Sequence, residues 1–139
     1  MPRIQWSDTY TIFDEELDQH HKQLIRYLAV LESPEHRDPA DPEFVTMIVD
    51  GLVDYAGYHF AAEEAKMLAL GYPDTVAHQA EHADFRKDVL IFREDFGKGS
   101  PGMDRMLVGY LKDWILAHIL ASDRRFGEWS LTHRAPPPA

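Results

Sequence analysis

The chain has 139 residues, of which 45% are hydrophobic, so its length suits one domain with a single core. Lys and Arg number 14 against 24 Asp and Glu, and the formal net charge of −10 argues against nucleic acid or an anionic membrane surface as a partner. Because there is no Cys, disulfides, thiolate zinc sites and iron–sulfur clusters are excluded. We find neither a signal-peptide pattern nor the roughly 20 apolar residues of a membrane span, so we expect a cytoplasmic protein.

The hydrophobic pattern predicts an N-terminal arm, four helices and a short tail. The arm covers residues 1–13, and its aromatic side chains are expected to hold it against a neighbouring surface. The first helix is expected from Asp14 to Glu32. The Ser33-Pro34 pair ends it, because the residue before a proline disfavours helix.

Three further helices are expected over 42–70, over 75–96, and from 101 to about 125 or a little beyond. Asp41-Pro42 and Ser100-Pro101 each place a good N-cap residue before a proline at the first helical position. In all four segments apolar residues recur in steps of three and four, which puts them on one helix face.

Four amphipathic helices with short connections predict an all-α fold, an up-down-up-down antiparallel bundle over residues 14–130. No alternating pattern typical of a strand is present. Residues 131–139, which end in Ala-Pro-Pro-Pro-Ala, are expected to form a flexible tail.

The inward stripes also carry side chains that commonly bind metals, which are costly to bury unless something binds them. These residues are His21, His59, Glu63, His78, His82, His118 and Asp123. They occur early in the first and third helices and late in the second and fourth. Because neighbouring helices of such a bundle run in opposite directions, all of them should lie towards one end, in a single site.

The spacing of these residues suits a pair of metal ions. His78 and His82 are four residues apart, as are His59 and Glu63, so each pair points the same way from adjacent helical turns. Imidazole-rich sites with carboxylates suit iron, copper, zinc or nickel rather than calcium or magnesium. Seven ligands are too many for one tetrahedral zinc and fit two ions bridged by the two carboxylates.

Two positions need a further argument. His118 and Asp123 are five residues apart, and on an ideal α-helix they would diverge by about 140°. We therefore predict a π-type or otherwise loosened turn there, which would realign them. In the first helix His21 shares the apolar stripe, whereas His20 lies in a more polar row. We expect His21 to be the ligand and His20 to lie beside it or face solvent.

The motifs that carry these residues resemble those of the hemerythrins, specifically the single-domain bacteriohemerythrins, over nearly the whole chain. The segments that carry the resemblance are Trp6–Tyr10 in the arm, residues 17–22 around the first ligand, HFxxEE at 59–64, HxxxH at 78–82, and WxxxHI with a later Asp at 114–123. Two positions depart from the family pattern. His20 stands where Gln is frequent, and Phe13 stands where a small residue, often Gly, is usual.

The resemblance implies a non-heme centre of two iron ions that binds O2 reversibly, for storage, delivery or sensing, in a protein that is not an enzyme. One iron would be held by His78, His82 and His118. The other would be held by His21 and His59 and would keep an open position for O2. The bridges would be Glu63, Asp123 and an oxo or hydroxo group, and the O2 pocket would be lined by Trp114, Ile115 and Ile119. A monomer is expected, and a sensor would need a separate protein partner.

The main alternative is a di-iron enzyme that acts on O2, peroxide or nitric oxide. Ferritin-type oxidases use Glu-rich sites with two ExxH motifs. No such motif supplies the ligands here, and five of the seven are His. We expect this less negative centre to favour reversible binding over O–O cleavage. A zinc site or a purely structural bundle is a further alternative.

Overall fold

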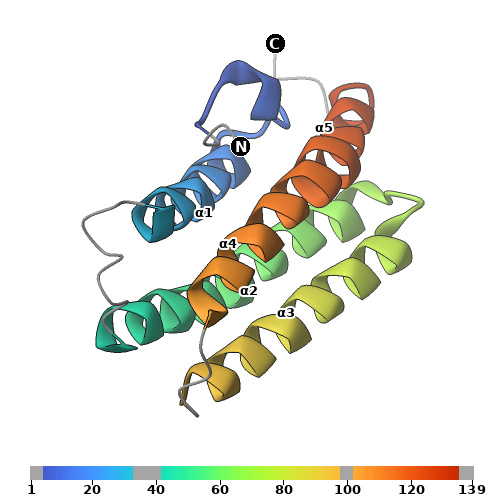
Figure 1. Cartoon of the computed structure of the whole chain (residues 1–139). Helices are drawn as coiled ribbons and strands as arrows, with labels where there is room; N and C mark the ends of the chain where they lie inside the picture. The colour runs from blue at the N-terminus through green and yellow to red at the C-terminus, as the bar shows by residue number, and fades with distance from the viewer. Residues whose placement is uncertain (1–4, 33–41, 98–101, 135–139) are drawn as a thin grey trace.

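The computed structural model describes residues 5–32, 42–97 and 102–134, and every regular element in these ranges is helical (Figure 1). The elements are η1 (Asp8–Tyr10), α1 (Glu15–Glu32), α2 (Pro42–Leu70), α3 (Thr75–Gly97), α4 (Met103–Trp114), η3 (Ile115–Asp123) and α5 (Arg124–Leu131). The last three follow one another without a break and form one long rod. The all-α bundle expected from the sequence is confirmed. No helix in the described ranges has the length and apolar content needed to cross a membrane.

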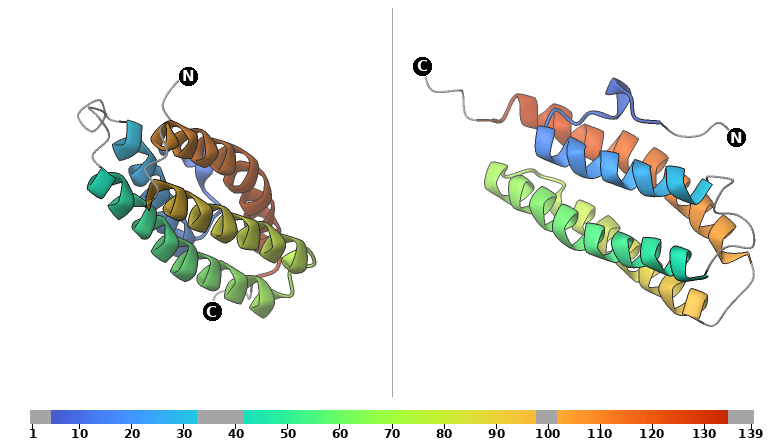
Figure 2. Two further views of the ribbon diagram at one scale, coloured as in Figure 1. Left: turned by 60° about the horizontal axis from the view of Figure 1, so that its bottom comes forward. Right: turned by 90° about the vertical axis from the view of Figure 1, so that its left-hand side faces the viewer.

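The helices form two layers. Figure 2 shows α1 beside the rod of α4, η3 and α5 in one layer, and α2 beside α3 in the other. The packed pairs are α1 with α2, α2 with α3, α3 with α4, and α1 with α4, so each helix has two neighbours. Successive helices run in opposite directions, as predicted. The starts of α1 and α3 therefore lie at the same end of the bundle as the ends of α2 and of the last rod.

Local chemistry fixes the helix ends that the structure describes. Asp14 caps α1, since its Oδ1 accepts a hydrogen bond from Leu17 N at 3.0 Å. Gly71 ends α2 in the left-handed region with φ 72°, and Tyr72 N then bonds back to Met67 O at 2.9 Å. The cap predicted at Asp41, the connection over 33–41 and the start predicted at Ser100-Pro101 lie outside the described residues.

The arm is held against the last helix by its backbone. Arg124 of α5 donates hydrogen bonds to Thr9 O at 3.2 Å and Thr11 O at 3.0 Å, and its guanidinium lies 4.7 Å from the centre of the Phe13 ring. Arg134, in the segment predicted as tail, donates to Phe13 O. Residues 135–139 of that segment lie outside the description.

The backbone at Ile12 and Phe13 is closely constrained where the arm meets the bundle. Phe13 has φ 62°, a left-handed conformation that favours glycine. Gly127 of α5 lies against the Ile12 backbone, where any Cβ would collide with main-chain atoms. The arm is therefore packed onto α5 at a position where only glycine leaves room.

The buried apolar residues form two clusters with the ligand-type residues between them. The larger cluster includes Leu24, Phe60 and Ile119 and extends to Leu31 near the end of α1 and Val45 near the start of α2. The smaller cluster, at the end covered by the arm, consists of Ile12, Leu17, Met67, Tyr72 and Phe126. On each of α1, α2 and the last rod, a ligand-type residue lies between a residue of one cluster and a residue of the other. The polar residues are thus shielded from solvent on both sides.

Candidate metal centre

The structure brings all seven predicted residues together. Their side chains are between 0% and 3% exposed and come from α1, α2, α3 and η3. They form two overlapping groups, in each of which the potential ligand atoms lie within 4.8 Å of one another. The first group contains Glu63, His78, His82, His118 and Asp123, and the second contains His21, His59, Glu63 and Asp123.

Each of the two carboxylates is shared between the groups. Glu63 Oε1 lies 2.5 Å from His78 Nε2 and 3.1 Å from His82 Nε2, whereas its Oε2 lies 3.4 Å from His59 Nε2. Asp123 Oδ1 lies 2.7 Å from His78 Nε2, whereas its Oδ2 lies 3.0 Å from His21 Nε2. Each carboxylate therefore directs one oxygen at imidazoles of the first group and the other oxygen at imidazoles of the second.

Several of these atoms are close without being hydrogen-bonded. His118 Nε2 lies 3.0 Å from Asp123 Oδ1, yet both atoms, with Glu63 Oε2, have no hydrogen-bond partner among the described residues. Ligand-type atoms that lie this close without a hydrogen bond between them can direct their lone pairs at a common point, where an ion would lie. Neighbouring ligands of an ion with bonds of about 2.1 Å at right angles lie about 3 Å apart. The donor set and its spacing therefore fit metal ions.

Without a metal, protons balance the buried carboxylates. Burial disfavours the charged form of His78, but its contacts with Asp123 and Glu63 outweigh this and raise its pKa to about 9. Burial likewise opposes charge on His118, but Asp123 raises its pKa to about 10. Burial lowers the pKa of His59 to about 4. At neutral pH the metal-free site thus holds protons on His78 and His118, and a metal ion must displace them.

A π-helical segment places the last carboxylate. The predicted distortion is confirmed, because η3 is π-helical from Ile115 to Asp123. A π-turn aligns residues five apart, whereas an α-turn would rotate Asp123 away from His118. Both side chains are buried as a result, with exposed fractions of 2% for His118 and 0% for Asp123.

The Nδ1 atoms of His59 and His82, which face away from the centre, are hydrogen-bonded to other side chains, and that of His118 lies near a carboxylate. His82 Nδ1 donates to Glu64 Oε2 at 2.7 Å, and His118 Nδ1 lies 3.5 Å from Glu81 Oε1. His59 Nδ1 is hydrogen-bonded to His20 Nδ1 at 2.9 Å, so His20 lies beside the site as expected. Such partners fix the orientation and tautomer of an imidazole. Spacing along a single helix cannot identify Glu64 and Glu81 as these neighbours, because the contacts cross between helices.

Aromatic rings stack on three of the imidazoles. Phe60 stacks on His82 at 3.8 Å, Trp114 stacks on His118 at 4.0 Å, and Tyr55 stacks on His59 at 4.9 Å, all within 14° of parallel. Sequence reasoning missed the part played by Tyr55 and Phe60. For Tyr55 the signal was its position four residues before His59, which equals that of Trp114 before His118.

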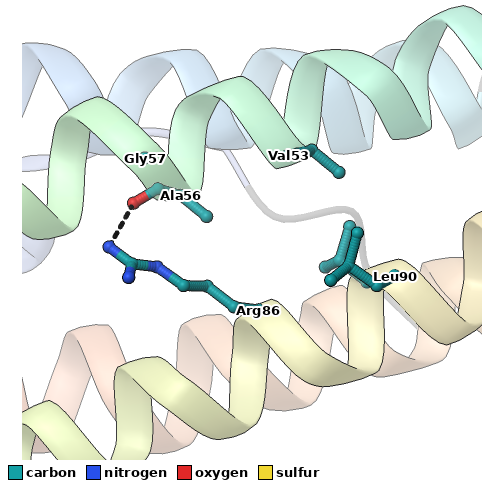
Figure 3. A pocket seen from close by; sticks show the side chains of 6 residues that line it. Val53, Ala56, Gly57, Arg86 and Leu90 are labelled. Carbon is teal, nitrogen blue, oxygen red and sulfur yellow. Dashed lines mark hydrogen bonds between the residues drawn. The ribbon is translucent and has the colours of Figure 1, made fainter.

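The predicted pocket residues lie next to the site on its apolar side. Ile115 is 0% exposed and Ile119 is 1% exposed, and both belong to the larger apolar cluster. Trp114 packs partly buried against that cluster. Figure 3 shows a different cavity of about 310 Å³ between α2 and α3, lined by residues such as Val53 and Arg86, and its lining includes none of the ligand-type residues.

The four-helix bundle and its buried imidazole–carboxylate cluster define a helical protein with a cation-binding centre. Residues 13–129 match the family model described as the hemerythrin HHE cation binding domain. The chain therefore belongs to the hemerythrin family.

Similar proteins agree over nearly the full length. The chain is 30% identical over 133 residues to a bacteriohemerythrin of Stenotrophomonas maltophilia, covering 96% of this chain and 85% of the relative. It is 29% identical to a bacteriohemerythrin of Ralstonia nicotianae, covering 98% of this chain and 94% of the relative. The crystal structure of a wild-type hemerythrin superposes with a TM-score of 0.80 at 23% identity, covering 91% of this chain and 97% of that one, which shows a shared fold.

Proposed function

We propose that this protein holds two iron ions and binds O2 reversibly at them, for storage, delivery or sensing. The observation that carries the proposal is the division of each carboxylate between two sets of imidazoles. Glu63 and Asp123 each direct one carboxylate oxygen at the first set and the other oxygen at the second set. Ligands that bridge two ions need this arrangement. Membership of the hemerythrin family supports iron as the metal, since imidazole and carboxylate ligands also suit other ions.

The two ions would have unequal sets of protein ligands. His78, His82 and His118 would hold one ion, whereas His21 and His59 would hold the other. The second ion would have fewer protein ligands and therefore room for a small molecule. When bound, the iron pair supplies the electrons that make O2 binding possible and that return when O2 leaves.

The protein's own residues would orient the ligands and exclude water. Glu64 and Glu81 face the outer nitrogens of His82 and His118 and would keep these rings in a metal-binding orientation. Ile115, Ile119 and Trp114 would line the pocket, where apolar side chains keep water away from the bound molecule. We place the protein with binding proteins rather than enzymes, because five neutral imidazoles and two carboxylates leave the centre less negative than a Glu-rich oxidase site.

Iron content and the visible spectrum test this function. The wild-type protein loaded with ferrous iron should contain two irons per chain, become coloured in air and lose the colour when O2 is removed. His118→Ala should lose the two-iron centre and the colour, because it removes a buried ligand. His133→Ala is the matched control, since His133 is exposed and contacts Trp129 rather than the site.

Either of two results would contradict the proposal. A wild-type protein that takes up iron but shows no reversible colour change does not carry O2. A His118→Ala protein that retains two irons and reversible O2 binding would show that the ligand assignment is wrong.

A further inference from the structure

The hydroxyl of Tyr55 is a buried hydrogen-bond donor for which the described part of the chain offers no partner. The Tyr55 side chain is 0% exposed, and among the described residues its hydroxyl oxygen has no hydrogen-bond partner. Burying an O–H group without a partner destabilises the folded protein. Phenylalanine would fill the same space without this cost, so we expect the hydroxyl to have a partner that is not among the described residues.

Stacking geometry places this hydroxyl beside the metal centre. Tyr55 lies one turn before His59 on α2, and the two rings are stacked at 4.9 Å with planes 13° apart. Since a phenol is longer than an imidazole, parallel rings from adjacent turns bring the Tyr55 hydroxyl at least as far into the bundle as His59 Nε2. Burial raises the pKa of the Tyr55 phenol, and the negative charges of Asp123 and Glu63 raise it further. This agrees with a position of the hydroxyl close to both carboxylates.

The hydroxyl lies on the side of the centre that faces the apolar core. Glu63 follows His59 by one turn of α2, whereas Tyr55 precedes it by one turn, so the two residues flank His59 along the helix. Tyr55 belongs to the larger apolar cluster together with Ile115 and Ile119. Its other ring neighbours include Phe60, with ring centres 6.2 Å apart. The surroundings of Tyr55 are thus largely apolar apart from the centre itself.

We propose that the Tyr55 hydroxyl donates a hydrogen bond to the small molecule bound at the ion that His21 and His59 hold. The inference rests on the proposed function, because it requires that ion and its open position. A neutral phenol donates one hydrogen bond, and hydrogen bonds to anionic acceptors are stronger than those between neutral groups. Tyr55 would therefore favour small molecules that are anions, or that gain negative charge when they bind, over neutral apolar ones.

Azide, a small anion that binds ferric iron, is a suitable probe. The experiment compares the wild-type diferric protein with Tyr55→Phe, which removes only the hydroxyl. Tyr58→Phe is the matched control on the same helix, because that side chain is 45% exposed. We measure iron content, the azide dissociation constant by spectrophotometric titration, and the shift of the bound azide vibration when H2O is replaced by D2O.

We expect all three proteins to hold two irons. Tyr55→Phe should bind azide about tenfold more weakly or worse, since a hydrogen bond to a charged acceptor is worth at least about 1.4 kcal/mol. It should also lose the D2O shift that the wild type and Tyr58→Phe retain. The metal-free Tyr55→Phe protein should melt at a higher temperature than the wild type, because its core no longer contains an unpaired hydroxyl.

Different results would overturn different claims. If Tyr55→Phe keeps the wild-type azide affinity and D2O shift, Tyr55 is not the donor, and the proposed function is unaffected. If metal-free Tyr55→Phe melts at a lower temperature, the hydroxyl has a structural partner and this inference is wrong. If the wild type holds no pair of irons, the proposed function fails and the inference fails with it. If it holds the pair but binds no azide, the inference alone is wrong.

Discussion

Deletion of Ala121 should leave the metal centre intact, although it removes a residue between two ligands. Ala121 is an exposed residue of the π-helical segment η3. Without it, His118 and Asp123 would be four residues apart, the spacing of His59 and Glu63 on α2. On a regular α-helix their directions would then differ by about 40°, instead of about 140° for residues five apart. The π-turn should therefore revert to α-helix without turning the carboxylate away.

The loss of stability expected from the Ala121 deletion is small because the residue is removed from within a π-turn. A π-turn holds one residue more than an α-turn, so its removal leaves α5 facing the arm as before. We expect the metal-free protein to lose no more than about 1 kcal/mol, or roughly 3 °C in melting temperature for a chain of this size. Deletion of Asp113, an exposed residue of regular α4, should instead rotate all later residues by about 100° and shift them by about 1.5 Å.

Cobalt titration and thermal melts followed by circular dichroism distinguish the two deletions. The Ala121 deletion should bind two equivalents of Co²⁺ and melt close to the wild type. The Asp113 deletion should lose the tight sites, because it turns His118 and Ile115 off their positions. The reasoning would be refuted if removing Ala121 abolished Co²⁺ binding while the protein remained folded, since η3 would then be needed for more than the direction of one carboxylate.

The remaining predictions concern protons and packing. Co²⁺ affinity should rise with pH by up to about 100-fold per unit between pH 7 and 9, because His78 and His118 must each release a proton, and a flat profile would contradict their raised pKa values. The metal-free protein should lose stability over the same range, since the unfolded chain releases these protons near pH 6.5, and denaturant melts would measure it. Gly127→Ala should destabilise by about 1–3 kcal/mol because a Cβ would collide with the Ile12 backbone. Gly109→Ala, where an added Cβ would meet no other side chain or neighbouring element within 4 Å, should stabilise by up to about 1 kcal/mol, and equal melting temperatures for the two variants would contradict this reasoning.

Much of the fold and of the site could be predicted because both depend on periodicity along single helices. The stripe through His21 and the four-residue spacing of His78 and His82 follow directly from 3.6 residues per turn. The same rule showed that His118 and Asp123 could not both face inward on a regular helix, so even the distortion was predictable. These inferences need only local geometry and the alternation of helix directions.

Features that depend on contacts between helices could not be found in this way. The choice of Glu81 as the neighbour of His118 depends on how α3 lies against η3, which no spacing within one helix reveals. The hold of Arg124 on the arm joins residues more than a hundred positions apart. The position of Tyr55, four residues before His59, can be read from the sequence. That its hydroxyl finds no partner among the described residues can be seen only in the folded structure.

The division of the two carboxylates has a consequence for how the halves of the molecule are joined. One helical hairpin, α1 with α2, supplies His21, His59 and Glu63, and the other, α3 with the last rod, supplies the remaining ligands. Glu63 of the first hairpin faces His78 of the second, while Asp123 of the second faces His21 of the first. With two ions bound, each carboxylate would cross-link the hairpins through a different pair of bonds. Metal binding would then stabilise the contact between the two hairpins reversibly, and this stabilisation would increase with the concentration of free metal.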